Sequence, residues 1–274
     1  MSISIEVSDV SLRFGGVQVL DRVAFTAAPG TIHAVIGPNG AGKSSTFNVI
    51  SGLYKPGEGT VRIDGEDVGQ RRPHQIAELG LGRAFQNIAL VGHAPVIDNI
   101  MVGRHRLMQV SILGSALGLP RGRREEQRHR ERVIQIAEFV GLGDYLHAPA
   151  GSLSYGGRKK IELARALASE PRAILLDEPV AGMPAHEKRE IADVVRSIRD
   201  SLGTTVLIVE HDMPLIMSLA DQITVLDFGR VIADGTSEEV QSDPAVIAAY
   251  LGEDERDINT EVMAQVGIEK EHGA

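Results

Sequence analysis

Alternating hydrophobic and polar residues mark the beginning of the chain and predict strands. A half-buried strand is indicated by three alternating aliphatic residues, Ile3, Ile5 and Val7. A Gly15-Gly16 turn and a second apolar run over 17–20 follow, and the sequence VRIDGEDV at 61–68 is typical of a short hairpin. Together these segments predict an antiparallel subdomain near the N-terminus.

A different pattern, in which short apolar runs alternate with amphipathic stretches, occupies the second half of the chain. The predicted elements follow one another as helix 158–169, strand 173–177, helix 186–201, strand 205–209, helix 214–220 and strand 222–227. Earlier in the chain, an apolar strand at 31–37 runs into a glycine-rich loop, and a helix is expected from Lys43 to Gly52. Strands that alternate with helices predict an α/β fold with a parallel sheet.

Residues 98–140 have a mostly helical pattern. An arginine- and glutamate-rich stretch at 121–132 becomes amphipathic over 133–140. This stretch is either a solvated helix with ion pairs one turn apart or a contact surface for anionic headgroups or a partner helix. The last residues, 253–274, are acidic and weakly patterned, which predicts a flexible tail.

Composition narrows the classes of function. The formal net charge of −9 argues against a nucleic-acid binder, which usually carries a basic excess. Because the sequence contains no cysteine, a disulfide scaffold, a thiolate metal site and a cysteine nucleophile are excluded. The N-terminus lacks a basic segment followed by an apolar core, so no secretory signal is expected. The most apolar stretch, 110–119, is about half the length needed to span a bilayer, so we expect any membrane role to be peripheral.

One segment matches the phosphate-binding pattern G-x4-G-K-[ST] at every fixed position: Gly37, Pro38, Asn39, Gly40, Ala41, Gly42, Lys43 and Ser44. The glycines let successive backbone N–H groups point at an anion, and the following helix adds its positive N-terminal end. Lys43 supplies a charge for the β- and γ-phosphates, Ser44 is a candidate Mg²⁺ ligand, and Ser45 belongs to the predicted site. An ordinary glycine-rich turn is the alternative, which the preceding strand and following helix disfavour.

Four further side chains at predicted strand ends suit the same chemistry. The run AILLDE ends in Asp177, placed to enter a Mg²⁺ shell, and Glu178, placed to act as a general base toward water. The run VLIVEHD carries His211, which is suited to hydrogen-bond a γ-phosphate and the attacking water. Gln86 follows a short apolar stretch and is another candidate Mg²⁺ ligand. Each is also compatible with a plain polar strand end, and the phosphate loop favours the catalytic interpretation.

These motifs, in this order, resemble the nucleotide-binding subunit of ABC transporters over about residues 3–252. The resemblance implies an α/β P-loop NTPase of the ABC ATPase type, with a mixed sheet and an antiparallel β subdomain. It also implies one nucleotide-binding domain over 1–252 that contains a helical lobe at about 87–165. The tail at 253–274 lies beyond this similarity.

The resemblance assigns roles to individual positions. Asp177 and Glu178 correspond to the end of the Walker B motif and the catalytic glutamate that follows it. Gln86 falls at the family's Q-loop glutamine, and His211 falls at its switch histidine. Phe14 stands where the family has an aromatic ring that stacks on adenine, and an ordinary strand phenylalanine is the alternative.

The segment LSYGG at 153–157 looks like the family signature LSGGQ. Physically, the Ser154 hydroxyl and the N–H groups of Gly156 and Gly157 at a helix N-terminus form an anion site. In the family this site faces the γ-phosphate held by the other subunit, so the resemblance implies that two subunits enclose ATP. Tyr155 replaces the usual first glycine and Gly157 the usual glutamine.

Several local features resemble the branched-chain (hydrophobic) amino-acid uptake group: LRFGG near the start, LSYG in the signature, DEPVAGM, and YLGED near the end. The resemblance implies an ATP-hydrolysing subunit that uses ATP and Mg²⁺ to energise an importer of branched-chain or other hydrophobic amino acids. Urea or amide uptake, lipopolysaccharide export and iron–sulfur assembly remain alternatives. Pro184, where the family often has the D-loop aspartate, is a departure at the cross-dimer contact.

The implied partners are a second ABC ATPase subunit, identical or paralogous, integral membrane permease subunits and, indirectly, a solute-binding protein. No nucleic acid is expected. The implied location is the cytoplasmic face of the cell membrane. ATP would close the dimer, Gln86 would transmit the movement of the helical lobe, and the lobe around 87–140 is the candidate docking surface.

Overall fold

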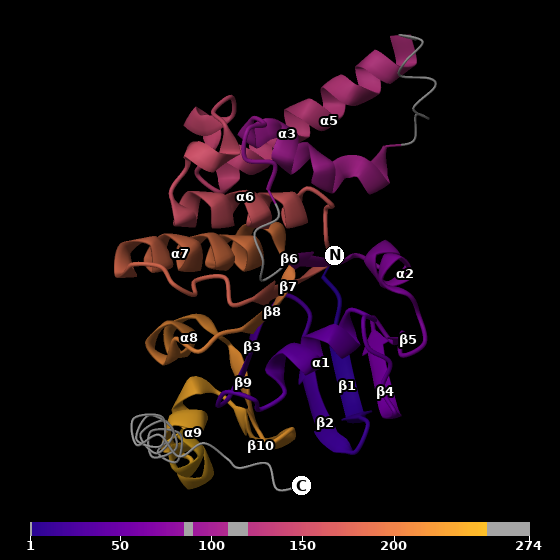
Figure 1. The fold of residues 1–274 in the computed structure, drawn as a ribbon, viewed down its shortest axis with the longest axis vertical. Helices are drawn as coiled ribbons and strands as arrows, with labels where there is room; N and C mark the ends of the chain where they lie inside the picture. The colour runs from indigo at the N-terminus through magenta and orange to yellow at the C-terminus, as the bar shows by residue number, and fades with distance from the viewer. Residues whose placement is uncertain (1, 85–89, 109–119, 251–274) are drawn as a thin grey trace, which may run out of the picture.

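The computed structural model describes residues 2–84, 90–108 and 120–250 and contains two β-sheets with helices packed around them (Figure 1). The larger sheet has the strand order β10-β9-β3-β8-β7-β6. Its strands are β3 (Ile32–Ile36), β6 (Leu81–Ala84), β7 (Ala173–Asp177), β8 (Thr205–Val209), β9 (Gln222–Asp227) and β10 (Arg230–Gly235). Neighbouring strands run parallel, except that β10 is antiparallel to β9. The predicted α/β fold with a mixed sheet is therefore confirmed.

The central strands of this sheet are covered on both faces. Every residue of β3, β7 and β8 is buried, as expected for parallel strands between two layers. Side chains of β3 alternate: Ile32, Ala34 and Ile36 join a core with α7 (Ala185–Leu202) and α8 (Met213–Leu219). Val35 points to a second core that contains Phe47 of α1 (Lys43–Ile50).

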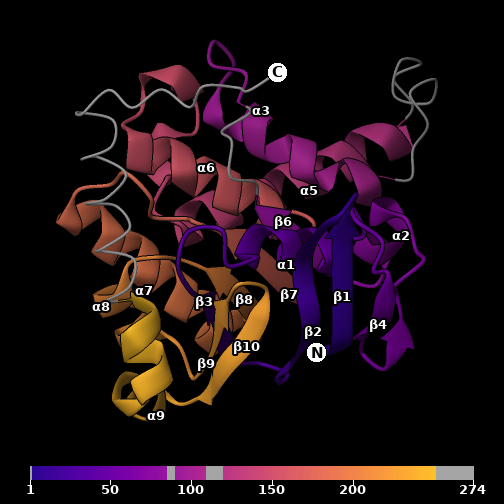
Figure 2. The ribbon, with the colours of Figure 1, turned by 60° about the horizontal axis from the view of Figure 1, so that its bottom comes forward.

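The second sheet is wholly antiparallel and has the strand order β2-β1-β4-β5. Its strands are β1 (Ile5–Phe14), β2 (Val17–Ala27), β4 (Glu58–Ile63) and β5 (Glu66–Asp67). Ile5 pairs with Ala27 on one side and with Ile63 on the other, and the β1–β2 hairpin turns at Gly15-Gly16. The antiparallel subdomain is confirmed, and Figure 2 shows β1, β2 and β4 side by side.

A group of helices lies at the β6 end of the larger sheet, whereas α9 (Ser237–Ser242) packs on β9 and β10 at the other end (Figure 1). It consists of α3 (Val96–Met101), the 3₁₀ helices η1 (Val102–Leu107), η2 (Gly143–Tyr145) and η3 (Ala150–Ser152), and the longer helices α5 (Pro120–Phe139) and α6 (Tyr155–Leu167). The predicted amphipathic stretch is confirmed, because its apolar side chains Val133, Ile136, Ala137 and Val140 are buried. The buried Arg104 guanidinium donates to His129 of α5 (3.0 Å) and to the Ala168 carbonyl (3.1 Å) after α6.

Some elements differ from the sequence-based prediction. Helix α6 begins at Tyr155, three residues earlier than predicted, because the Ser154 hydroxyl caps it by accepting from the Gly157 N–H (3.1 Å). Strand β10 and the short helices α2 (Pro73–Glu78) and α9 (Ser237–Ser242) were not predicted. Within the described ranges, no helix is both long and apolar enough to cross a membrane. The predicted tail at 253–274 lies outside the described residues.

Candidate active site

The phosphate loop joins β3 to α1, and its glycines are required for different reasons. Gly37 has a φ of 148°, and a Cβ added there would lie 2.0 Å from the Leu226 carbonyl oxygen. Gly42 has a φ of 103°, and an added Cβ would lie 2.7 Å from a methyl of Leu20. Gly40 has open space around it but a φ of 79°, so the backbone conformation alone favours glycine.

Lys43 is buried at the first position of α1 and is held by the loop itself. Its Nζ donates to the carbonyl oxygens of Gly37 (2.6 Å) and Pro38 (2.9 Å). Ser44 is exposed and Ser45 half-buried, and no side chain caps the N-terminus of this helix. An ammonium group and a helix N-terminus at one glycine-rich turn form an environment that stabilises a phosphate.

Asp177 ends β7 as a buried carboxylate with one satisfied oxygen. Its Oδ2 accepts from a guanidinium nitrogen of Arg83 at 3.2 Å, whereas the buried Oδ1 has no hydrogen-bond partner in the described part of the chain. Burial raises the pKa of Asp177, and the Arg83 charge opposes that shift. A buried carboxylate oxygen without a donor fits a hard divalent cation, which prefers oxygen ligands.

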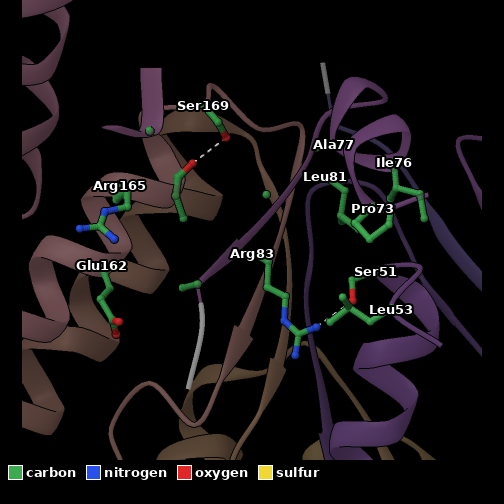
Figure 3. A pocket seen from close by; sticks show the side chains of 14 residues that line it. Ser51, Leu53, Pro73, Ile76, Ala77, Leu81, Arg83, Glu162, Arg165 and Ser169 are labelled. Carbon is green, nitrogen blue, oxygen red and sulfur yellow. Dashed lines mark hydrogen bonds between the residues drawn. The ribbon is translucent and has the colours of Figure 1, made fainter. Parts of the chain in front are cut away.

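Arg83 of β6 was not predicted to belong to the site. Besides Asp177, its guanidinium donates to the Asn48 side chain (2.9 Å) and to Ser51 Oγ (2.7 Å) at the end of α1. Figure 3 shows the side chain crossing from β6 toward Ser51. The only signal in the sequence was an arginine in the short strand LGRA before Gln86, which itself lies outside the described residues.

Glu178 follows Asp177 in a backbone conformation that is uncommon for a residue with a side chain. Its φ is 49°, and its N–H donates to the carbonyl oxygen of Val209, the last residue of β8 (2.9 Å). The ends of β7 and β8 are paired through Asp177 and Val209. This hydrogen bond fixes the direction in which the half-buried Glu178 leaves the sheet.

Glu210 connects the segments that carry Glu178 and His211, and sequence reasoning did not identify it. The side chain is fully buried; one carboxylate oxygen accepts from the Val180 N–H (2.8 Å) and the other from the His211 N–H (3.1 Å). Burial raises the pKa of Glu210, while the backbone donors oppose the shift. The His211 side chain is 60% exposed, with Nδ1 at 3.7 Å from the Glu210 carboxylate.

The parallel strands β3, β8 and β7 are neighbours in the sheet, so the predicted loop, His211, Asp177 and Glu178 gather at one edge. This arrangement follows from parallel strands, whose carboxyl ends lie on the same side. Phe14 lies elsewhere, at the tip of the β1–β2 hairpin, where it is half-exposed and contacts Tyr54 edge-on with ring centroids 5.1 Å apart. Its stacking on adenine stays a prediction.

The LSYGG segment forms the N-terminus of α6, where its donors contact a carboxylate from α7. Ser154 Oγ donates to Glu187 Oε1 (2.9 Å), and the Gly156 N–H donates to Glu187 Oε2 (3.2 Å). Tyr155 is 39% exposed, and the Arg158 guanidinium lies over its ring, 5.9 Å from the ring centroid. In the described chain, Glu187 is therefore the acceptor at the signature, which sequence reasoning did not anticipate.

Two family models match this chain: one described as ABC transporter over residues 20–181 and one described as branched-chain amino acid ATP-binding cassette transporter over 230–256. The chain is 37% identical to the high-affinity branched-chain amino acid transport ATP-binding protein BraF of Pseudomonas aeruginosa, covering 91% of this chain and 98% of BraF. It is 35% identical to LivG of Escherichia coli over the same shares. Among solved structures, it is similar to the ADP conformation of MJ1267, an ATP-binding cassette of an ABC transporter, with a TM-score of 0.80 and 31% identity over 92% of this chain and 100% of that one.

Proposed function

Since the chain belongs to the ABC transporter family, in its branched-chain amino acid group, we propose that it hydrolyses ATP to energise uptake of branched-chain or other hydrophobic amino acids. The observation that carries this proposal is the buried Asp177, whose Oδ1 lacks a donor in the described chain while the adjacent strand β8 separates it from the phosphate-loop strand. A carboxylate in this position suits a metal-bound nucleotide rather than a purely structural ion pair.

The residues at the carboxyl ends of β3, β7 and β8 have different roles in the proposed reaction. The loop amides and Lys43 bind the phosphates, and Ser44 and Asp177 would hold Mg²⁺ together with Gln86. When bound, Mg²⁺ neutralises negative charge on the β- and γ-phosphates. Arg83 orients the Asp177 carboxylate by holding Oδ2, which leaves Oδ1 for the cation.

Glu178 accepts the proton of the attacking water. Oxygen then bonds to the γ-phosphorus, the bond to the ADP oxygen breaks, and the products are ADP and phosphate. The Val209 carbonyl fixes the backbone of Glu178. Glu210 keeps the Val180 and His211 N–H groups in place, so the base and the histidine share one support.

The second half of each site comes from another copy or a paralogue, through Ser154, Gly156 and Gly157 at the N-terminus of α6. We propose that the permease contact extends from the lobe around 87–140 to a pocket between the lobe and the rest of the chain, which Gly103, Leu53, Ile76 and Arg165 line among others (Figure 3). Its walls come from both parts, so a bound helix of a membrane subunit would respond when the lobe moves. The subunit then resides at the cytoplasmic face of the membrane.

ATP turnover and ATP-dependent self-association of the purified chain test this function. Wild type should hydrolyse ATP, whereas Glu178→Gln should bind ATP, lose turnover and accumulate as a dimer, because the base is gone while the binding groups remain. Asp193→Asn is the matched control, since it removes an exposed carboxylate of α7 that pairs with Arg196 of the same helix. Wild-type turnover in the Glu178→Gln variant would contradict the proposal, and a variant that stays monomeric with ATP would exclude the homodimer.

A further inference from the structure

An anion already lies at the N-terminus of α6, and it belongs to the same chain. The Glu187 carboxylate uses both oxygens there: one accepts from Ser154 Oγ at 2.9 Å and the other from the Gly156 N–H at 3.2 Å. The third donor, the Gly157 N–H, is directed to Ser154 Oγ. Hydrogen bonds to a charged acceptor at a helix N-terminus are favourable, so this is a stable contact rather than an incidental one.

The position of Glu187 follows from how α7 is held. The helix begins at Ala185, directly after Pro184, which places Glu187 in its first turn. Two ion pairs anchor the same turn and the next: Lys188 with Asp212 (2.5 Å) and Glu190 with Lys160 of α6 (2.7 Å). Both pairs bring α7 toward neighbouring elements and direct the Glu187 side chain at α6.

The contact requires glycine at 156. A Cβ added to Gly156 would lie 2.6 Å from the carboxyl group of Glu187. Gly157 also lacks a side chain, so nothing from the signature itself comes between the helix N-terminus and α7. The glycine pair therefore serves the carboxylate in this chain as well as any incoming anion.

The donors that Glu187 occupies are those that the proposed function assigns to the terminal phosphate of ATP on the partner subunit. A carboxylate and a phosphate are both anions, and they cannot accept from Ser154 Oγ and the Gly156 N–H together without strong repulsion. A cavity of about 430 Å³ next to the contact, lined by Lys160 and Glu190 among others, has room for a displaced carboxylate.

We propose that Glu187 is a tethered competitor of the γ-phosphate: it holds the signature in the separate subunit and must leave before two ATP-bound subunits close. This inference rests on the proposed function, because it concerns regulation of the same dimer site. As a consequence, the dimer closes only at a higher concentration of ATP-bound subunit than it would need if Glu187 did not compete with the γ-phosphate. Glu187 thereby sets a threshold that suppresses hydrolysis in unpaired subunits.

The test compares Glu178→Gln with the double variant Glu178→Gln/Glu187→Ala by sedimentation at increasing ATP. Removing the competitor should lower the ATP concentration for half-maximal dimer by about tenfold, the effect expected for losing charge-assisted hydrogen bonds of this kind. Glu178→Gln/Glu187→Gln should move in the same direction by less. Glu178→Gln/Asp193→Ala should not move, although it removes the same charge from the same helix, because the exposed Asp193 pairs with Arg196 of α7 itself. An unchanged or raised ATP requirement in the Glu187→Ala variant overturns the proposal.

A second measurement does not depend on dimerisation. It tests whether Glu187 competes with phosphate even if the Glu178→Gln parent never dimerises and the proposed homodimer is wrong. The Gly156 and Gly157 amide resonances are followed by NMR while inorganic phosphate is added to the monomeric chain. In wild type they should stay unchanged, and in Glu187→Ala they should shift and saturate. Equal shifts in both proteins, or none in either, would contradict the competition. Equal melting temperatures of Glu187→Ala and Asp193→Ala exclude a folding artefact.

Discussion

The two anion sites of this chain differ in what prepares them. At the strand ends of the larger sheet, buried groups are restrained by other elements: Asp177 by Arg83, and the segments of Glu178 and His211 by Glu210. At the N-terminus of α6, the exposed Ser154 and the buried Gly156 donate to a carboxylate of the neighbouring helix. The residues of the first site are in place within one subunit. The donors of the second site are also in place, but the Glu187 carboxylate occupies them. A subunit of this kind can bind nucleotide alone and yet resist closing on a partner.

The glycine that opens the phosphate loop tests how rigid the assembled site is. Gly37→Ala should destabilise the chain by about 4 kcal/mol, because its Cβ would lie 2.0 Å from the Leu226 carbonyl at a φ of 148°. Urea denaturation measures the free energy of unfolding. Gly16→Ala is the control, since nothing lies within 4 Å of its Cβ and its φ is not positive. A loss below about 1 kcal/mol at Gly37 would mean that β9 can move away and that the loop is not rigidly held.

A buried histidine under the loop makes the stability of the same region depend on pH. His33 of β3 contacts Thr224 Oγ1 (2.7 Å), which donates to Asp234 (2.9 Å). Burial lowers the pKa of His33 from 6.5 to about 4, with Asp234 opposing. Between pH 6.5 and about pH 4, His33 therefore binds a proton in the unfolded chain but stays mostly neutral in the folded chain. The contribution of His33 is intact above pH 6.5 and falls with pH, by about 3 kcal/mol at pH 4.

Unfolding free energies of wild type and His33→Gln between pH 7 and pH 4 measure this loss. The variant should be less stable at pH 7 but should lose less stability on acidification, so the two curves converge. Parallel curves for wild type and His33→Gln would show that His33 is not neutral in the folded chain.

Substitution of Asp177, the carboxylate assigned to Mg²⁺, distinguishes a role in catalysis from a role in holding the structure together. Asp177→Asn should lower the turnover number by about a hundredfold, equivalent to about 2.7 kcal/mol, and should raise the Mg²⁺ concentration needed for half-maximal activity. Steady-state phosphate release at varied Mg²⁺ measures both. Asp193→Asn, which removes an exposed carboxylate paired with Arg196, should leave both unchanged. Turnover within twofold of wild type would exclude Asp177 from the metal site.

A smaller effect is expected at Glu210, which supports the site without touching its ligands. In Glu210→Gln the side chain retains one carbonyl oxygen, so either the Val180 or the His211 N–H loses its acceptor. The turnover number should fall about tenfold, equivalent to about 1.4 kcal/mol, with an unchanged KM for ATP, because the phosphate loop is intact. An equal change in KM would instead indicate that the variant disturbs nucleotide binding.

The features of the fold that the sequence predicted are those whose signal lies in residues adjacent along the chain. The strands at 173–177, 205–209 and 222–227 are confirmed to the residue, because each is a short apolar run with polar residues at both ends. Strand β10 was missed because its apolar run, at 231–233, is only three residues long and is not fully buried. The phosphate loop and the acidic end of β7 were predicted from residues adjacent in sequence.

The supporting residues of the site were not predictable in the same way. Arg83 and Asp177 are 94 positions apart, and Glu187 and Ser154 are 33 apart, so only the fold brings each pair together. Glu210 stands beside His211 in the sequence, but its burial, and hence its role, depends on Val180 from another segment. Sequence motifs thus predict the groups that face a ligand better than the groups that hold them.

Simultaneous measurement of ATP binding and association on Glu178→Gln tests the contrast between the two sites most directly. Fluorescent ATP binding and sedimentation are recorded on the same samples across a range of ATP concentrations. The contrast predicts that the monomer saturates with ATP at concentrations well below those that produce the dimer, because the strand-end site is assembled and the signature is occupied by Glu187. If binding and dimerisation instead rise together at one ATP concentration, the separate subunit has no assembled nucleotide site, and the account is wrong.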